Sequence, residues 1–93
     1  MRSEPDRVSA WCVYILRCAD GSLYTGITTD VTRRLAEHNA GGGAGARYTR
    51  GRTPVHLVYL QAASNRAEAA RLEASIKRLR RASKLALCAG ETI

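Results

Sequence analysis

The sequence predicts an α+β fold with the element order strand, strand, helix, strand, helix, helix. Two apolar runs flank an Asp20-Gly21 pair, which is a strong hairpin signal. Two later segments begin with residues that cap helices well. The 93 residues support one domain with one modest core. We expect that domain over residues 10–89, after a polar leader (1–9) that frays and before a short tail (90–93).

The first two strands are expected to form the arms of a hairpin. The run W-C-V-Y-I-L-R is apolar on both faces, and S-L-Y-T-G-I-T returns after the turn. Successive side chains of a strand point to opposite faces, so the neighbours of Tyr14 and Tyr24 point away from these tyrosines. Each tyrosine can therefore face a site while its neighbours face the core. Gly26 indicates a close backbone approach or a strand end.

The first helix is expected from Val31 to about Ala40, because Asp30 is a suitable N-cap. Arg34 and His38 lie four residues apart on it and therefore share a face. This helix offers a cation beside an imidazole.

A glycine-rich and then arginine-rich segment, G-G-G-A-G-A-R-Y-T-R-G-R-T-P, follows. It is typical of a flexible loop and not of a phosphate-binding P-loop, because no G-K-[ST] follows the glycines. The run V-H-L-V-Y-L-Q then predicts the third strand.

A long helix is expected to begin at Ser64 or Asn65 and to run to about Arg81, since Asn65 and Glu68 have capping-box spacing. Its core stripe comprises Ala69, Leu72, Ile76 and Leu79. A short last helix over residues 83–89 completes the order.

The charge of the chain is strongly basic and unevenly distributed. A net charge of +7 and a pI near 10.0 favour a polyanionic partner. The first 30 residues carry three arginines against four acidic residues. Residues 31–52 carry five arginines against one acidic residue, and residues 66–84 carry seven cations against two. Positive charge is thus concentrated in the two segments that carry or adjoin candidate catalytic residues.

Neither a membrane span nor a secretory signal is predicted. No apolar run approaches the roughly 18 residues of a span, and the polar start has no apolar signal core. We therefore expect a cytoplasmic protein. Cys12, Cys18 and Cys88 are odd in number and lack C-x-x-C spacing, so they predict buried apolar residues, not a disulfide framework or a zinc site.

Tyr14, Tyr24 and Arg34 recur at ten-residue intervals, and Glu73 follows beside the core stripe of the long helix. Two phenols, a guanidinium and a carboxylate suit phosphodiester hydrolysis, because the attack adds negative charge to a phosphate that is already charged. Arg34 can hold two nonbridging oxygens, a geometry that lysine lacks. Glu73 can hold Mg²⁺ and leave other metal positions to water and phosphate oxygen.

The motifs V-Y-I, L-Y-T-G, R-R-L-A-E-H-N and L-E-A-S-I-K, in that order, resemble the GIY-YIG endonuclease superfamily (URI domain), in particular its small stand-alone bacterial YhbQ-like members. The resemblance covers about residues 10–86. It implies a three-stranded antiparallel or mixed sheet flanked by helices, and cleavage of DNA with Mg²⁺ or Mn²⁺. By position, it implies a catalytic set of Tyr14, Tyr24, Arg34, His38 and Glu73, with Glu73 as the metal ligand.

The chain departs from the family pattern at several positions. Cys12 and Val13 stand where the name-giving motif has glycine and isoleucine, and Thr25 stands in the middle of Y-T-G. Ile27 occupies the place of a lysine found in some relatives, and an asparagine expected on the helix after the glutamate has no counterpart. Both tyrosines are retained.

The tyrosine roles follow from charge. A tyrosine with a pKa of about 10 is a poor base, but nearby positive charge lowers that pKa, and either Arg34 or a metal ion can supply it. We assign Tyr14 as general base and Tyr24 as the residue that positions phosphate or water, although relatives have been interpreted with either tyrosine as the base. His38 can relay the proton or bind the scissile phosphate. Phosphate or base contacts are expected from Arg33, Arg47, Tyr48, Arg50, Arg52 and Lys77.

The sequence thus predicts a monomeric, metal-dependent endonuclease of low sequence specificity. A chain this short has no second domain to read a groove, so single-stranded, branched or damaged DNA is the expected substrate unless a protein partner directs it. One alternative is a binding module that keeps the fold and basic surface but does not cut. Another is a protein-interaction adaptor, which needs an exposed apolar face, and none is predicted beyond the stripes that the core requires.

Overall fold

The computed structural model describes residues 10–40 and 47–90. The predicted leader (1–9), the glycine-rich residues 41–46 and the end of the tail (91–93) lie outside the described residues. The predicted α+β class and element order are confirmed. The elements are β1 (Cys12–Arg17), β2 (Leu23–Thr28), α1 (Val31–Ala40), β3 (His56–Ala62), α2 (Arg66–Lys77) and α3 (Arg81–Cys88).

The three strands form one antiparallel sheet in the order β2-β1-β3. The central strand, β1, pairs Tyr14 with Gly26 of β2 and with Leu60 of β3. Its register with β3 shifts between Ile15 and Leu16. Both β2 and β3 are edge strands, and the exposed side chains of Leu57 and Leu60 on β3 add apolar surface that was not predicted.

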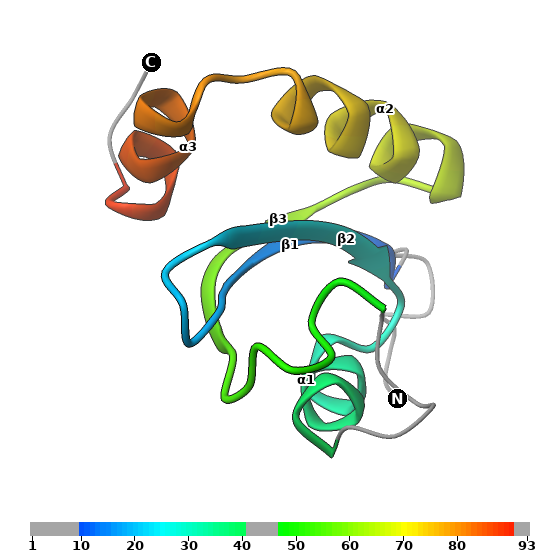
Figure 1. Ribbon diagram of the computed structural model, residues 1–93. Helices are drawn as coiled ribbons and strands as arrows, with labels where there is room; N and C mark the ends of the chain where they lie inside the picture. The colour runs from blue at the N-terminus through cyan, green and yellow to red at the C-terminus, as the bar shows by residue number, and fades with distance from the viewer. Residues whose placement is uncertain (1–9, 41–46, 91–93) are drawn as a thin grey trace.

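Helices cover both faces of the sheet, with α1 on one side and α2 and α3 on the other (Figure 1). Tyr14 and Leu16 point toward α1, whereas Val13 and Ile15 point toward α2 and α3, as strand alternation predicts. Each face has its own small core. Tyr14 thus faces α1, away from Val13 and Ile15, and its ring belongs to the core under that helix.

Two polar contacts fix α1 in place. The carboxylate of Asp30 accepts a hydrogen bond from the N–H of Arg33 at 3.1 Å, which confirms the predicted N-cap. Near the other end, the Asn39 side chain accepts from the N–H of Val55 at 2.7 Å and donates to its carbonyl at 3.1 Å. Asn39 does more than end the helix, because it ties α1 to the segment that leads into β3.

The turn between β1 and β2 is held by contacts with two other segments of the chain. Gly21 has a φ of +86°, which explains the Asp-Gly signal because a residue with a Cβ is strained there. Asp20 forms an ion pair with Arg52 at 3.0 Å, and the guanidinium of Arg81 donates to the carbonyl of Gly21 at 2.9 Å. The turn therefore joins the 47–52 loop to the start of α3.

The long helix predicted to reach Arg81 ends at Lys77, and α3 begins at Arg81 instead of Ser83. Arg78 ends α2 in a helical conformation, whereas Arg80 is extended. A continuous helix through α3 would span about 35 Å, whereas a strand of this sheet spans about 20 Å. The break lets the apolar residues of α2 and α3 pack on the same core.

The start of α2 agrees with the capping prediction, since the Asn65 side chain accepts from the N–H of Glu68 at 2.8 Å. The carboxylate of Glu68 returns to the N–H of Ser64, one residue earlier than a capping box requires. Cys12 and Cys18 are buried as predicted, and Cys88 is half-buried.

Candidate active site

Three of the predicted site residues meet between the sheet and α1. The Tyr14 hydroxyl lies 3.1 Å from Nε2 of His38. The Tyr24 ring centroid lies 5.3 Å from that of His38 and 6.4 Å from that of Tyr14. The side chains of Tyr14 and His38 are each only 1% exposed. The hairpin and α1 thus bring two phenols and an imidazole into one buried cluster.

Gly26 makes the approach of Tyr14 possible. A Cβ at this position would lie 2.6 Å from the Tyr14 hydroxyl, closer than real Cβ contacts come, and would make a tight contact of 3.1 Å with the Tyr24 ring. The predicted reason for this glycine, a close approach to the backbone, is confirmed. Tyr14 of β1 and Gly26 of β2 are paired across the two strands, so the position of the Tyr14 ring depends on the glycine.

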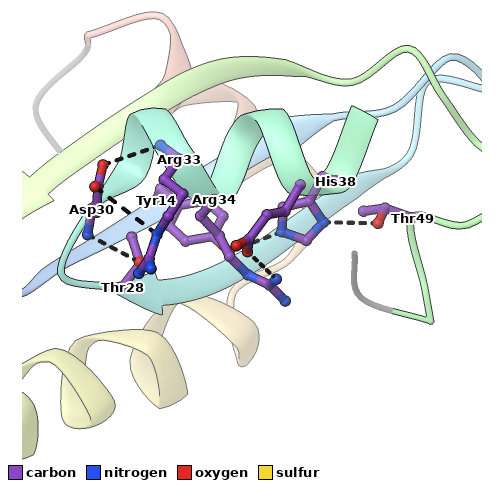
Figure 2. A network of polar contacts seen from close by, with 8 residues as sticks. Tyr14, Thr28, Asp30, Arg33, Arg34, His38 and Thr49 are labelled. Atoms are coloured by element: carbon purple, nitrogen blue, oxygen red, sulfur yellow. Dashed lines mark hydrogen bonds and ion pairs between the residues drawn. The ribbon is translucent and has the colours of Figure 1, made fainter. Parts of the chain in front are cut away.

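His38 has a second partner that the sequence did not indicate. Its Nδ1 lies 2.8 Å from the hydroxyl of Thr49, and Thr49 is fully buried (Figure 2). Thr49 belongs to the arginine-rich loop, in which polar residues are ordinary, so nothing in the local sequence distinguishes it. Only the path of the loop back to α1 reveals its role.

Arg34 lies beside this cluster, on the same helix as His38. Its Nη1 donates to the carboxylate of Glu37 at 2.9 Å, and its positive charge acts on the nearby Tyr14 hydroxyl and lowers the pKa of that group. Arg34 and Glu37 are both partly exposed. The prediction overlooked Glu37, although its i+3 position on α1 places it next to Arg34.

Burial controls the proton affinities in the cluster. Loss of solvent, reinforced by the neighbouring Tyr24, raises the pKa of Tyr14 to about 12, although Arg34 acts in the opposite direction. Arg34 lowers this pKa, as expected, but desolvation is the larger effect. Burial, and then the charge of Arg34, lower the pKa of His38 below its ordinary value. His38 is therefore neutral at neutral pH.

Glu73 comes from the other layer of the molecule. It lies on α2, which packs on the face of the sheet opposite to α1. Its carboxylate forms an ion pair with Lys77 at 3.3 Å, and its side chain is 24% exposed. The described contacts do not join Glu73 to Tyr14, Tyr24, Arg34 or His38, because α2 packs on the face of the sheet opposite to their cluster.

The donors present suit a weakly held hard cation. Within residues 10–40 and 47–90, no group of three His, Cys, Asp or Glu side chains could hold a metal. A partly exposed carboxylate such as Glu73 fits Mg²⁺ or Mn²⁺, because Mg²⁺ keeps several waters and is commonly bound through one or two carboxylates plus substrate phosphate. It does not fit zinc, which requires three or four protein ligands.

The predicted nucleic-acid contacts divide into engaged and exposed residues. Arg52 pairs with Asp20, donates to the Tyr48 carbonyl at 2.7 Å and lies 4.4 Å from the Tyr48 ring centroid. The Tyr48 ring, 39% exposed, lies 5.7 Å from that of Tyr24. Exposed side chains are those of Arg33, Arg47, Arg50 and Lys77, of which Arg33 approaches Asp30 at 3.9 Å and Lys77 pairs with Glu73.

Comparison with known proteins identifies relatives along most of the chain. The GIY-YIG catalytic domain model matches residues 10–86. A UPF0213 protein of Desulfotalea psychrophila is 56% identical over 78 residues, covering 84% of this chain and 69% of that protein. One from Halobacterium salinarum is 57% identical over 75 residues, covering 81% and 95%.

A solved structure supports the same relationship. The solution NMR structure of UPF0213 protein BH0048 from Bacillus halodurans shares 49% identity with this chain at a TM-score of 0.54. The match covers 85% of this chain and 82% of that one. Within the described residues, no helix is long and apolar enough to cross a membrane. This chain belongs to the GIY-YIG nuclease superfamily and is similar to its small UPF0213 members.

Proposed function

We propose that this protein is a divalent-metal-dependent endonuclease that hydrolyses DNA phosphodiester bonds with little sequence specificity. The observation that carries the proposal is the contact between the Tyr14 hydroxyl and His38 Nε2, next to Arg34, in a GIY-YIG domain. A buried phenol that is hydrogen-bonded to a neutral imidazole can pass its proton to that imidazole. The adjacent guanidinium suits the charge that develops on the phosphate.

Tyr14 acts as general base through His38. A free phenolate is disfavoured because the pKa of Tyr14 is about 12. The Tyr14 oxygen therefore takes a proton from the attacking water while its own proton passes to Nε2 of His38. The water oxygen bonds to phosphorus, the bond to the leaving oxygen breaks, and solvent protonates that oxygen. Of the two earlier roles of His38, its burial favours proton relay over phosphate binding.

Arg34 binds and stabilises the phosphate. Its fork can hold two nonbridging oxygens, and its side chain is 28% exposed, so a phosphate can reach it from solvent. In the free protein Glu37 occupies one arm of the guanidinium at 2.9 Å. Phosphate oxygens replace this carboxylate when substrate binds. Tyr24 positions the phosphate or the attacking water.

Glu73 holds the metal, which is Mg²⁺ or Mn²⁺. When bound, such an ion offsets negative charge on the phosphate and orients water. Glu73 lies on α2, which packs against β2, so we place the scissile phosphate at the β2 edge, where both layers can approach it. Lys77 must release the carboxylate or share it when the ion binds.

DNA is held mainly through its phosphates. The exposed Arg33, Arg47 and Arg50 provide charge near the candidate site, and Tyr48 provides a ring for a base. The described residues include no element that inserts into a groove, which favours single-stranded, branched or damaged DNA, with a protein partner supplying any further specificity. Such a substrate is available in the cytoplasm. Equal cleavage of intact duplex and single strands at matched salt would remove this preference.

The second candidate is a nucleic-acid-binding module that does not cut. The burial of Tyr14 favours it, since a hydroxyl that is bonded to His38 and 1% exposed must become accessible to water before it can act. Retention of both Arg34 and Glu73 favours the enzyme.

The test is strand cleavage of labelled single-stranded, branched and duplex DNA with Mg²⁺ or Mn²⁺. The native protein is compared with Glu73→Gln, with an EDTA control. Glu68→Gln is the matched control, because it lies on the same helix and glutamine keeps the capping contact. The proposal predicts cleavage that disappears with EDTA and with Glu73→Gln only. Salt-sensitive binding without cleavage on any substrate would leave the binding module.

A further inference from the structure

We propose that Thr49 is a positioning residue that fixes the tautomer of His38, accepting a hydrogen bond from Nδ1–H so that Nε2 faces Tyr14 without a proton. The inference rests on the proposed nuclease function and adds a residue to it. The geometry that carries it is a buried chain of three side chains. The Tyr14 hydroxyl lies 3.1 Å from Nε2, and the Thr49 hydroxyl lies 2.8 Å from Nδ1.

The hydrogen-bond inventory selects this tautomer. A neutral imidazole has one N–H donor and one acceptor nitrogen. The guanidinium of Arg34 lies near Tyr14 but can only donate, so it offers no acceptor for the Tyr14 O–H. The buried Tyr14 O–H must itself donate, and the acceptor within reach is Nε2 of His38. The proton of neutral His38 therefore resides on Nδ1, directed at the Thr49 oxygen.

The loop holds the Thr49 hydroxyl in place. The N–H of Arg52 donates to the Thr49 carbonyl at 2.9 Å, and the Arg52 carbonyl accepts from the N–H of Ala19 at 2.8 Å. The Arg52 side chain is also paired with Asp20. These contacts fasten Thr49 to the β1–β2 turn, on the same hairpin that carries Tyr14. The relative positions of Tyr14 and Thr49, on either side of His38, thus depend on the contacts between this loop and the hairpin.

Removal of the hydroxyl should reverse the tautomer. In Thr49→Val, which keeps the shape of the side chain, Nδ1–H loses its acceptor in a buried site. The proton then moves to Nε2, where it donates to the Tyr14 oxygen and prevents His38 from accepting the Tyr14 proton. The single-turnover cleavage rate should fall at least about tenfold, the effect of one hydrogen bond of typical net strength. DNA affinity should be unchanged, because Thr49 is fully buried.

The experiment combines imidazole ¹⁵N NMR with single-turnover cleavage of labelled single-stranded DNA. The variants are Thr49→Val, Thr49→Ser, which restores the hydroxyl, and Thr25→Val, a buried threonine on the face that packs against α2. A His56→Gln background leaves His38 as the only histidine signal. We expect the Nδ1–H tautomer in the native, Thr49→Ser and Thr25→Val proteins. Thr49→Val should show the Nε2–H tautomer and the slower rate.

The NMR readout does not depend on activity and needs no substrate. An Nε2–H tautomer in the native protein would overturn the inference even if no variant folded well. So would a Thr49→Val protein that keeps both the native tautomer and the native rate. If the tautomers behave as expected and no protein cuts DNA, the proposed function fails while the positioning by Thr49 stands.

Discussion

Tyr14 and His38 have proton affinities that define how the site can work. The pKa of Tyr14 is raised to about 12 and that of His38 is lowered, in both cases first by burial. These two shifts keep the proton on the Tyr14 hydroxyl and leave the His38 imidazole as a hydrogen-bond acceptor. Charge separation between them is costly in the resting protein. In the proposed mechanism, Tyr14 therefore gives its proton to His38 only as it takes a proton from the attacking water.

The pH dependence of cleavage distinguishes this relay from a phenolate base. Neutral His38 is the acceptor, so the rate should fall as pH drops through its depressed pKa and stay level from neutral pH to about pH 9. The ionisable groups around His38 are Tyr14, Tyr24, Arg34 and Glu37. A phenolate base would instead give a rate that rises about tenfold per pH unit over this range, because the pKa of Tyr14 is near 12. Single-turnover rates at constant ionic strength measure the difference.

Arg34 should not be replaceable by lysine. Arg34→Lys keeps the charge but loses the fork that can reach two phosphate oxygens while contacting Tyr14. We expect a loss of about 100-fold or more in the single-turnover rate, similar to removal of one transition-state donor. Arg33→Lys, on the same helix and more exposed, is the control and should change the rate little. Native rates in Arg34→Lys would exclude a bidentate role.

At the scale of residues, the order of the sequence motifs predicted four members of the cluster. Tyr14, Tyr24, Arg34 and His38 meet where strand parity and helix spacing place them. Thr49 was missed because its partner lies on another element and its loop has no local pattern. The pKa of Tyr14 was misjudged because burial is a tertiary property that charge counting does not include.

At the scale of elements, α1 is the part of the site whose position depends on few contacts. It is the one helix on its face of the sheet among the described residues, and Asn39 connects its last turn to Val55 through two hydrogen bonds. Both backbone groups of Val55 would lose their partner if this side chain were removed. The helix carries Arg34 and His38, so its anchoring also fixes the site.

Asn39→Ala should destabilise the fold by about 1–3 kcal/mol, the cost of leaving polar backbone groups unsatisfied where Val55 is buried. Urea denaturation measures the change. Ser75→Ala, an exposed position on α2, is the control and should stay within about 0.5 kcal/mol of the native protein. Equal midpoints for the two variants would show that the Asn39 contacts contribute little.

The boundaries of the elements were predictable where a local signal exists. The N-cap at Asp30 gave α1 its observed start, and the Asp-Gly pair located the hairpin turn. The end of α2 had no such signal, because the run K-R-L-R-R continues a helical pattern. The break depends on the width of the sheet beneath it, which a local pattern does not contain.

At the scale of the whole molecule, the excess positive charge lies outside the β1–β2 hairpin that carries Tyr14 and Tyr24. Arg47 and Arg50 project from the loop that adjoins the site, while the β1–β2 turn carries Asp20. This distribution was predictable from the sequence, since it needs only the positions of charged residues. Their placement around one site required the structure. The sheet has a helix layer on each face, and β2 and β3 form its two edges.

Binding to single-stranded DNA should weaken steeply with salt. If Arg47 and Arg50 each contact one phosphate, their joint replacement by glutamine should lower the slope of log K against log salt by about 1.4. Arg71→Gln, exposed on α2, is the control and should leave the slope unchanged. Fluorescence anisotropy over a salt series measures the slopes. An unchanged slope for the double variant would remove these arginines from the interface.

The most direct test of the account is the single-turnover rate of metal-dependent DNA cleavage by the native protein, Tyr14→Phe and Tyr59→Phe. Tyr59 is the matched control, because it is a strand tyrosine on the face that packs against α2 and α3, and its hydroxyl bonds Gln61. We predict that Tyr14→Phe binds DNA normally but cleaves at least about 100-fold more slowly, while Tyr59→Phe matches the native rate. Native cleavage by Tyr14→Phe would show that the chemistry does not use the buried cluster under α1.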